Sequence, residues 1–252
     1  MTNSIRSLYE SRCRNGAPYY WQPQEITKSP FAFNGEFGIK KSLERILASS
    51  EYLEIDVAQY TGETWKKLQG EVSPICKELL HSNIADEGVH SQQISKALKT
   101  YEVDANTIAE AKSLSEQWRS LPDSAIEKAT ALEIGVFLAA SLPIMLRCGG
   151  HSLTWIATQI SRDEQRHAAT NRYITNKLYS NNFSEQLQEL VKESVTWIVG
   201  DLDIKQWKVN KDWFLQQSQQ LMDTGIAPKL SQFTSASRYS PPFEDENSRF
   251  DY

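Results

Sequence analysis

Residues 152–179 read SLTWIATQISRDEQRHAATNRYITNKLY, and this stretch decides the fold. One stripe of residues recurs in it at steps of three or four, which is the period of an amphipathic helix, and large apolar side chains stand at both of its ends. The stripe is Ile156, Ile160, Glu164, His167, Asn171, Ile174 and Leu178. Glu164 and His167 fall in the same stripe, three residues apart. Residues three apart project from one side of a helix, so a carboxylate and an imidazole are predicted to enter the core together.

The same glutamate–histidine spacing occurs a second time, at Glu87 and His90. These residues lie in a second predicted helix, 73–101, which opens with a serine N-cap followed by proline. The chain has only four histidines. The other two, His81 and His151, have no such partner, and we interpret them as surface or helix-end residues.

Two further long helices supply one inward-facing glutamate each. The first is predicted over 37–68 and carries Glu54. The second begins at a capping box at Ser124, ends at Gly149 and carries Glu133. We therefore predict an all-α protein with a ferritin-like four-helix bundle core. Additional short helices are predicted at 103–120, 184–199 and 210–222.

The four glutamates are predicted to lie at one height in the core if the helices pair as two hairpins. Glu54 and Glu133 each lie 16 residues before the glycine that ends their helix, Gly70 and Gly149. On the following helices, Glu87 lies 14 residues after Ser73 and Glu164 lies 14 residues after Gly150. At 1.5 Å per residue this leaves a mismatch of about 3 Å. Four buried carboxylates so close together need cations, and two divalent ions would balance them.

Carboxylates with one imidazole per ion favour iron or manganese. We therefore predict two iron ions, or manganese and iron. The predicted ligands are Glu54, Glu87, His90, Glu133, Glu164 and His167. Glu51 and Asp56 are alternatives to Glu54, but Glu54 shares the inward stripe with Leu47 and Val57.

Composition limits the other functions. The 252 residues have a net charge of -5 and no basic run, so nucleic acid is not an expected partner. The longest apolar run, 134–146, is shorter than the roughly 20 residues that span a membrane, and 1–10 does not resemble a signal peptide. Three scattered cysteines fit a reducing, cytoplasmic location. We expect one domain, 1–230, followed by a mobile tail, 231–252.

The stretch 133–167, which ends in ISRDEQRH (160–167), resembles the small subunit of class I ribonucleotide reductase. The resemblance extends to EGVHS (87–91), ILA (46–48) and WQPQEI (21–26), the last being similar to the family's Trp-x-Pro-Glu-Glu-Val segment. The resemblance implies a homodimer whose di-metal centre reacts with dioxygen. It also implies that the centre supplies an oxidising equivalent to a large catalytic subunit for deoxyribonucleotide synthesis.

The resemblance also implies roles for residues outside the ligand set. Trp21 and Asp163 match the family's tryptophan and aspartate, which with the metal histidine conduct electrons toward the centre. The acidic, aromatic end of the chain, 243–252, is similar to the tail that docks on the large subunit, and Tyr239 is the candidate relay tyrosine there. Phe137 and Ile160 match apolar residues around the radical.

The sequence departs from the family where the radical tyrosine normally stands, four residues after the second-helix histidine. Ile94 occupies that position and cannot hold a phenoxyl radical. The oxidising equivalent would then reside on the metals or on a tyrosine such as Tyr52, Tyr60 or Tyr173. Two alternatives stay open: a stand-alone di-metal oxygenase or oxidase of a small substrate, which the resemblance of 163–167 to acyl carrier protein desaturases supports, and a non-enzymatic iron-binding protein.

Overall fold

A computed structural model describes residues 2–31, 38–68, 70–178, 183–204 and 209–224. The predicted tail with Tyr239 lies outside the described residues. Within these residues the protein is all-α apart from two very short antiparallel hairpins. In chain order the elements are α1 (Thr2–Arg12), β1 (Cys13–Arg14), β2 (Ala17–Pro18), α2 (Ile39–Lys67), α3 (Pro74–Tyr101), α4 (Ala105–Ser120), α5 (Ala125–Ala131), the π-helix η1 (Leu132–Ser141), α6 (Leu142–Cys148), α7 (Gly150–Leu178), α8 (Glu185–Val199), β3 (Asp203–Ile204), β4 (Val209–Asn210) and α9 (Lys211–Thr224).

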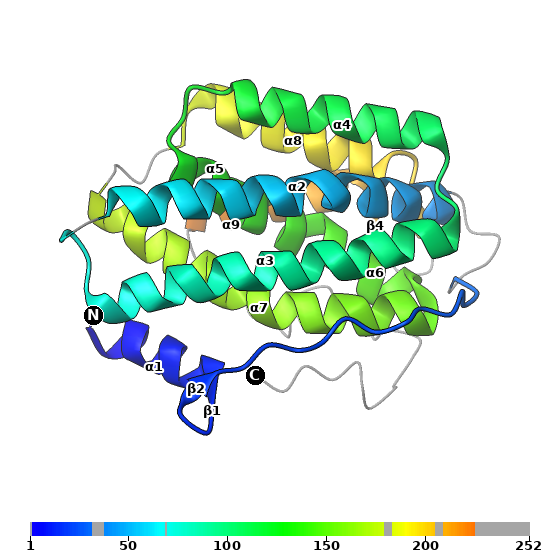
Figure 1. Cartoon of the computed structure of the whole chain (residues 1–252). Coiled ribbons are helices and arrows are strands. Elements are labelled where there is room, and N and C mark those ends of the chain that lie inside the picture. The colour runs from blue at the N-terminus through cyan, green and yellow to red at the C-terminus, as the bar shows by residue number, and fades with distance from the viewer. Residues whose placement is uncertain (1, 32–37, 69, 179–182, 205–208, 225–252) are drawn as a thin grey trace.

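Four long helical segments pack side by side around the core (Figure 1). Helix α2 packs on α3, and α3 packs on α7. The fourth segment is the uninterrupted run α5–η1–α6, which contacts both α7 and α2 and so closes the ring. The helices predicted from the sequence are confirmed to within a few residues. That the packing is of the ferritin-like type stays a prediction.

The predicted start signals act as capping residues in the structure. The Ser73 hydroxyl accepts a hydrogen bond from the backbone N–H of Cys76 and begins α3. Ser124 and Glu127 form the reciprocal capping box that begins α5. Each cap satisfies backbone groups that the first turn of a helix leaves without partners.

The shorter helices form an outer layer over one side of the four segments. Helix α4 lies across α2, and α8 and α9 pack against η1 (Figure 1). Gly135 permits this close approach, because a Cβ there would stand 2.8 Å from Val191 Cγ1 and 3.0 Å from Met222 Sδ. The Ser218 hydroxyl donates to the Gly135 carbonyl at 2.7 Å. The outer layer therefore holds η1 directly.

An N-terminal arm, which the sequence did not predict, crosses the opposite side of the molecule. Helix α1 and the first hairpin lead into an extended stretch that runs beside α3 and α7 (Figure 1). The arm is fixed by hydrogen bonds between Gln24 and Gln93 and by Ser29, which accepts from the backbone N–H of Ser152. It carries Trp21 into the core, where that side chain is only 7% exposed.

Among the described residues, the helical run Ala125–Cys148 is long and apolar enough to cross a membrane by length and composition. Its most apolar stretch is wholly buried inside the fold. Core helices pass the same test, so this run is weak evidence for a membrane span.

Candidate metal centre

The structure brings all six predicted ligands together at one level between α2, α3, η1 and α7. Each of these residues is at most 2% exposed. Their ligand atoms form two groups, each with all atoms within 4.8 Å of one another: Glu54, Glu87, His90 and Glu164, and Glu87, Glu133, Glu164 and His167. Glu87 and Glu164 belong to both groups. The buried glutamate–histidine groups can therefore hold metal ions, with two shared carboxylates between two positions.

The alternatives to Glu54 face other parts of the fold. Glu51 accepts a hydrogen bond from Ser95 at 2.9 Å. Asp56 points toward α4, where it accepts from the Ser115 hydroxyl and from Arg119 Nε, each at 2.6 Å. Of the three acidic residues considered on α2, only Glu54 is in the cluster.

Glu133 lies on the π-helix, a feature that the apolar periodicity did not reveal. A π-helix has an i→i+5 hydrogen-bond pattern and occurs often at functional sites. The amide of Asn171 donates to both carboxylate oxygens of Glu133, at 2.8 and 3.0 Å. Asn171 lies one helical turn after His167 on α7, so its position on the ligand stripe was the available signal for this contact.

Both histidines present the same ring nitrogen to the glutamates. Nδ1 of His90 is 3.3 Å from carboxylate oxygens of both Glu54 and Glu87. Nδ1 of His167 is 2.8 Å from Glu87 Oε1. The opposite nitrogens, Nε2, face carboxylates outside the cluster. In a metal site, such a carboxylate fixes the tautomer and orientation of the ligating imidazole.

These outer carboxylates come from the two helices that carry the histidines. Asp163 Oδ2 lies 3.1 Å from His90 Nε2, and Asp86 Oδ2 lies 3.1 Å from His167 Nε2. Asp163 was predicted as a site residue through the family resemblance, whereas Asp86 was missed. The available signal was its place immediately before Glu87, which matches that of Asp163 before Glu164.

When no cation is bound, two of the clustered glutamates and both histidines bind protons more tightly than usual. Burial, followed by the charge of Glu87, raises the pKa of Glu54 well above its ordinary value. Burial and the charge of Glu164 do the same for Glu133. Burial opposes the charged form of both histidines, but the surrounding carboxylates outweigh it and raise the pKa of each imidazole. Protons are therefore the competitors that a metal ion must displace.

The residues present fit a pair of divalent metal ions. Both carboxylate oxygens of Glu87 and of Glu164, and Nδ1 of His167, are buried without an aligned hydrogen bond. Such groups are costly to bury unless something binds them. Carboxylate oxygens and imidazole nitrogens are suitable ligands for iron or manganese, although they do not identify the metal.

Trp21 connects the centre to the N-terminal arm. Its indole Nε1 donates to Asp163 Oδ2 at 2.8 Å, the same oxygen that faces His90. The indole also stacks on the His90 ring, with 6.1 Å between ring centroids. The structure thus brings together Trp21, Asp163 and His90, the three residues for which the family resemblance implied a common role.

The other residues that the sequence singled out lie in the core or on its margin. Ile94, Phe137 and Ile160 are buried. Tyr60 is also buried, and burial raises its pKa; Asp56 is the next cause. Tyr52 and Tyr173 are partly buried. The placement of these tyrosines does not assign an oxidised residue.

Comparison of the chain with protein families, with curated proteins and with solved structures found no significant match.

Metal affinity is expected to rise with pH. His90, His167, Glu54 and Glu133 hold protons more tightly than usual, because their pKa values are raised. Since metal binding must release these protons, each one displaced should strengthen apparent affinity by up to about tenfold per pH unit below its pKa. Calorimetric titration with Mn²⁺ between about pH 6 and pH 8, in buffers of different ionisation enthalpy, measures both effects. An affinity independent of pH, without proton release, would contradict the assignment.

Proposed function

We propose that this protein is a di-metal redox protein that acts as the small subunit of a ribonucleotide reductase. The observation that carries the proposal is the continuous contact from Trp21 through Asp163 to His90 at the glutamate cluster. A metal-storage protein does not require such a connection. A protein that must receive single electrons from outside its core does.

The residues of this chain would perform distinct tasks. The six clustered side chains would hold two iron ions, or manganese and iron, which when bound supply the reaction with dioxygen. The fold buries the cluster and so excludes bulk water from it. Asp163 would keep the proton on Nε2 of His90, leaving the Nδ1 lone pair for the metal. Burial tends to raise the pKa of Asp163, but the neighbouring His90 and Arg166 outweigh it and lower the pKa to about 2.

Ile94 stands at the position of the family's radical tyrosine, so the proposal differs from the family pattern there. The side chain is buried in α3 and cannot be oxidised to a phenoxyl radical. The proposal therefore assigns no stored radical to this position. The proposed partner is a large catalytic subunit, and the proposed assembly is a homodimer.

Deletion of residues 240–252 is expected to abolish nucleotide reduction with a matching large subunit while leaving metal content unchanged. The reason is that the acidic, aromatic tail would dock the two subunits, whereas the metal ligands all lie in the helices. Reduction of a ribonucleoside diphosphate and metal analysis on the same preparation are the measurements. Full activity of the truncated protein would contradict the docking role.

The substitution Trp21→Phe tests the proposal at a residue that the structure describes. Phenylalanine keeps an aromatic ring in the core but removes the Nε1–H that Asp163 accepts. Reductase activity should fall by about 10² or more, as for a lost positioned contact, with both metal ions retained. Unchanged activity would remove the observation on which the proposal depends.

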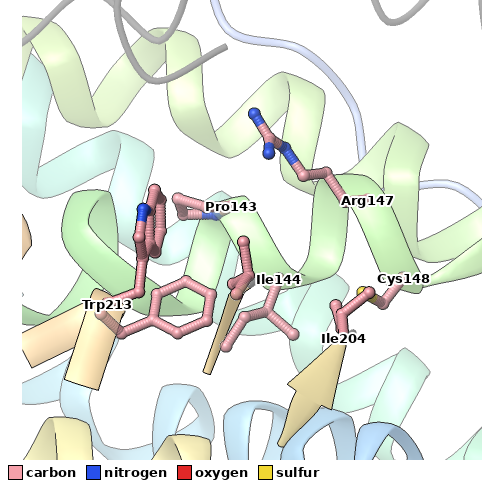
Figure 2. A pocket seen from close by; sticks show the side chains of 8 residues that line it. Pro143, Ile144, Arg147, Cys148, Ile204 and Trp213 are labelled. Atoms are coloured by element: carbon pink, nitrogen blue, oxygen red, sulfur yellow. The ribbon is translucent and has the colours of Figure 1, made fainter. Parts of the chain in front are cut away.

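A stand-alone oxygenase or oxidase is the second candidate, because the centre has no radical tyrosine at Ile94. Such an enzyme needs a substrate cavity beside its metals. The cavity in Figure 2 is water-sized, about 10 Å³, and lies between α6, the β3–β4 hairpin and α9. None of the six clustered residues lines it. Substrate-dependent oxygen consumption without a large subunit would favour this candidate.

A further inference from the structure

The two helices that carry the histidines share a five-residue pattern. It reads Asp86-Glu-Gly-Val-His90 on α3 and Asp163-Glu-Gln-Arg-His167 on α7. The aspartates are exchanged between the helices, because Asp86 faces His167 and Asp163 faces His90. The centre therefore contains two equivalent histidine–aspartate pairs, related by the antiparallel packing of α3 and α7.

The two pairs differ in the source of their cation. On α7, Arg166 donates to Asp163 Oδ1 from three residues further along the same helix. The corresponding position on α3 is Val89. Asp86 is fully buried and receives a guanidinium from another element: Arg12, the last residue of α1, donates to Asp86 Oδ1.

Arg12 is held firmly in this position. Its side chain is 4% exposed, it donates to the Tyr19 carbonyl, and its guanidinium lies 4.4 Å from the centroid of the Tyr20 ring. Nη1 also stands 3.9 Å from Asp163 Oδ1, although Arg166 is the nearer partner of that carboxylate. Arg12 therefore belongs mainly to the Asp86–His167 pair.

We propose that Arg12 is a positioning residue for the metal-binding imidazole of His167. Helix α1 thus contributes a residue that supports the metal centre. The inference rests on the proposed metal centre. Arg12 donates to Asp86 Oδ1 and so holds this carboxylate with Oδ2 turned toward Nε2 of His167, which then carries the proton. Nδ1 is left as the free ligand atom. The charges agree: four glutamates balance two divalent ions, and two aspartates balance Arg12 and Arg166.

The test uses Co²⁺, whose visible absorption bands report binding, in backgrounds that isolate one ion at a time. His90→Ala keeps the His167 position, and His167→Ala keeps the His90 position. Adding Arg12→Gln should weaken Co²⁺ binding by about 10- to 100-fold in the first background and by less than about threefold in the second. Arg14→Gln is the matched control, because Arg14 lies in the same arm over the ring of Tyr19 and is exposed.

Equal weakening in both backgrounds, or none in either, would overturn the proposal. If Arg12→Gln loses helicity, the double variant Arg12→Gln/Val89→Arg provides the test, since it places an arginine where α7 has its own. Recovery of the His167 ion supports the proposal, and a folded double variant that still binds it weakly overturns it. Failure of the unaltered chain to bind two Co²⁺ ions would instead refute the proposed metal centre.

Discussion

The substitution Glu164→Gln is expected to abolish tight binding of both divalent ions, whereas Glu54→Gln should abolish only one. Glu164 is common to both groups of ligand atoms, whereas Glu54 belongs to one. A neutral amide keeps the shape of the side chain but removes the charge and one strong acceptor oxygen. Each position would then lose a shared anionic ligand in the first variant, and only one position would lose a ligand in the second.

Metal content after anaerobic loading with Fe²⁺ or Mn²⁺ measures this difference. We expect about two ions per chain for the unaltered protein, near zero for Glu164→Gln and near one for Glu54→Gln. Glu51→Gln is the matched control, because Glu51 is on the same helix but accepts from Ser95 outside the cluster. Equal stoichiometry in the Glu164 and Glu54 variants would contradict the shared role of Glu164.

Loading the centre is expected to raise the melting temperature by about 10 to 20 °C. An ion present at 100 times its dissociation constant stabilises the folded state by about 2.7 kcal/mol. Two ions therefore contribute about 5 kcal/mol, and each kcal/mol raises the melting temperature of a protein of this size by about 2 to 4 °C. Thermal unfolding followed by circular dichroism, with and without Mn²⁺, measures the shift.

The same thermal unfolding experiment on Glu164→Gln provides an internal control. Without metal, Glu164→Gln should be at least as stable as the unaltered chain, because it removes one of four clustered buried carboxylates. With metal it should show almost no increase in melting temperature. If the unaltered chain melts at the same temperature with and without Mn²⁺, the cluster does not bind metal in the folded state.

Removing the metal is therefore expected to lower the stability of the protein, whereas replacing a ligand carboxylate is not expected to lower the stability of the apo protein. The native cluster is costly in the absence of cations, as the raised pKa values of Glu54 and Glu133 indicate. The fold tolerates this cost because the surrounding core is large and densely packed. Leu132, Val136 and Ile156, which lie on the same helical segments as Glu133 and Glu164, are fully buried. Stability is given up at the candidate metal site.

The sequence by itself predicted the four long helical segments and the six clustered residues. The stripes around Glu164 and His167 are local, so the 3.6-residue period is enough to place them on one buried face. Counting from the helix ends to Glu54 and Glu133 was also sufficient, because a helix has a fixed rise per residue and hairpins align their ends. The structure was needed to select Glu54, rather than Glu51 or Asp56, as the residue of α2 in the cluster.

The tertiary structure alone decided several of the contacts that surround the ligands. Arg12 lies 74 residues before Asp86 in the chain, and no periodicity links an N-terminal helix to a buried aspartate. The π-helix that carries Glu133 packs against α8 and α9, and the contact between Asn171 and Glu133 depends on how two helices face each other. The physical reason is that local repeats fix which face of a helix is buried. Partners from distant segments are chosen only when the chain packs.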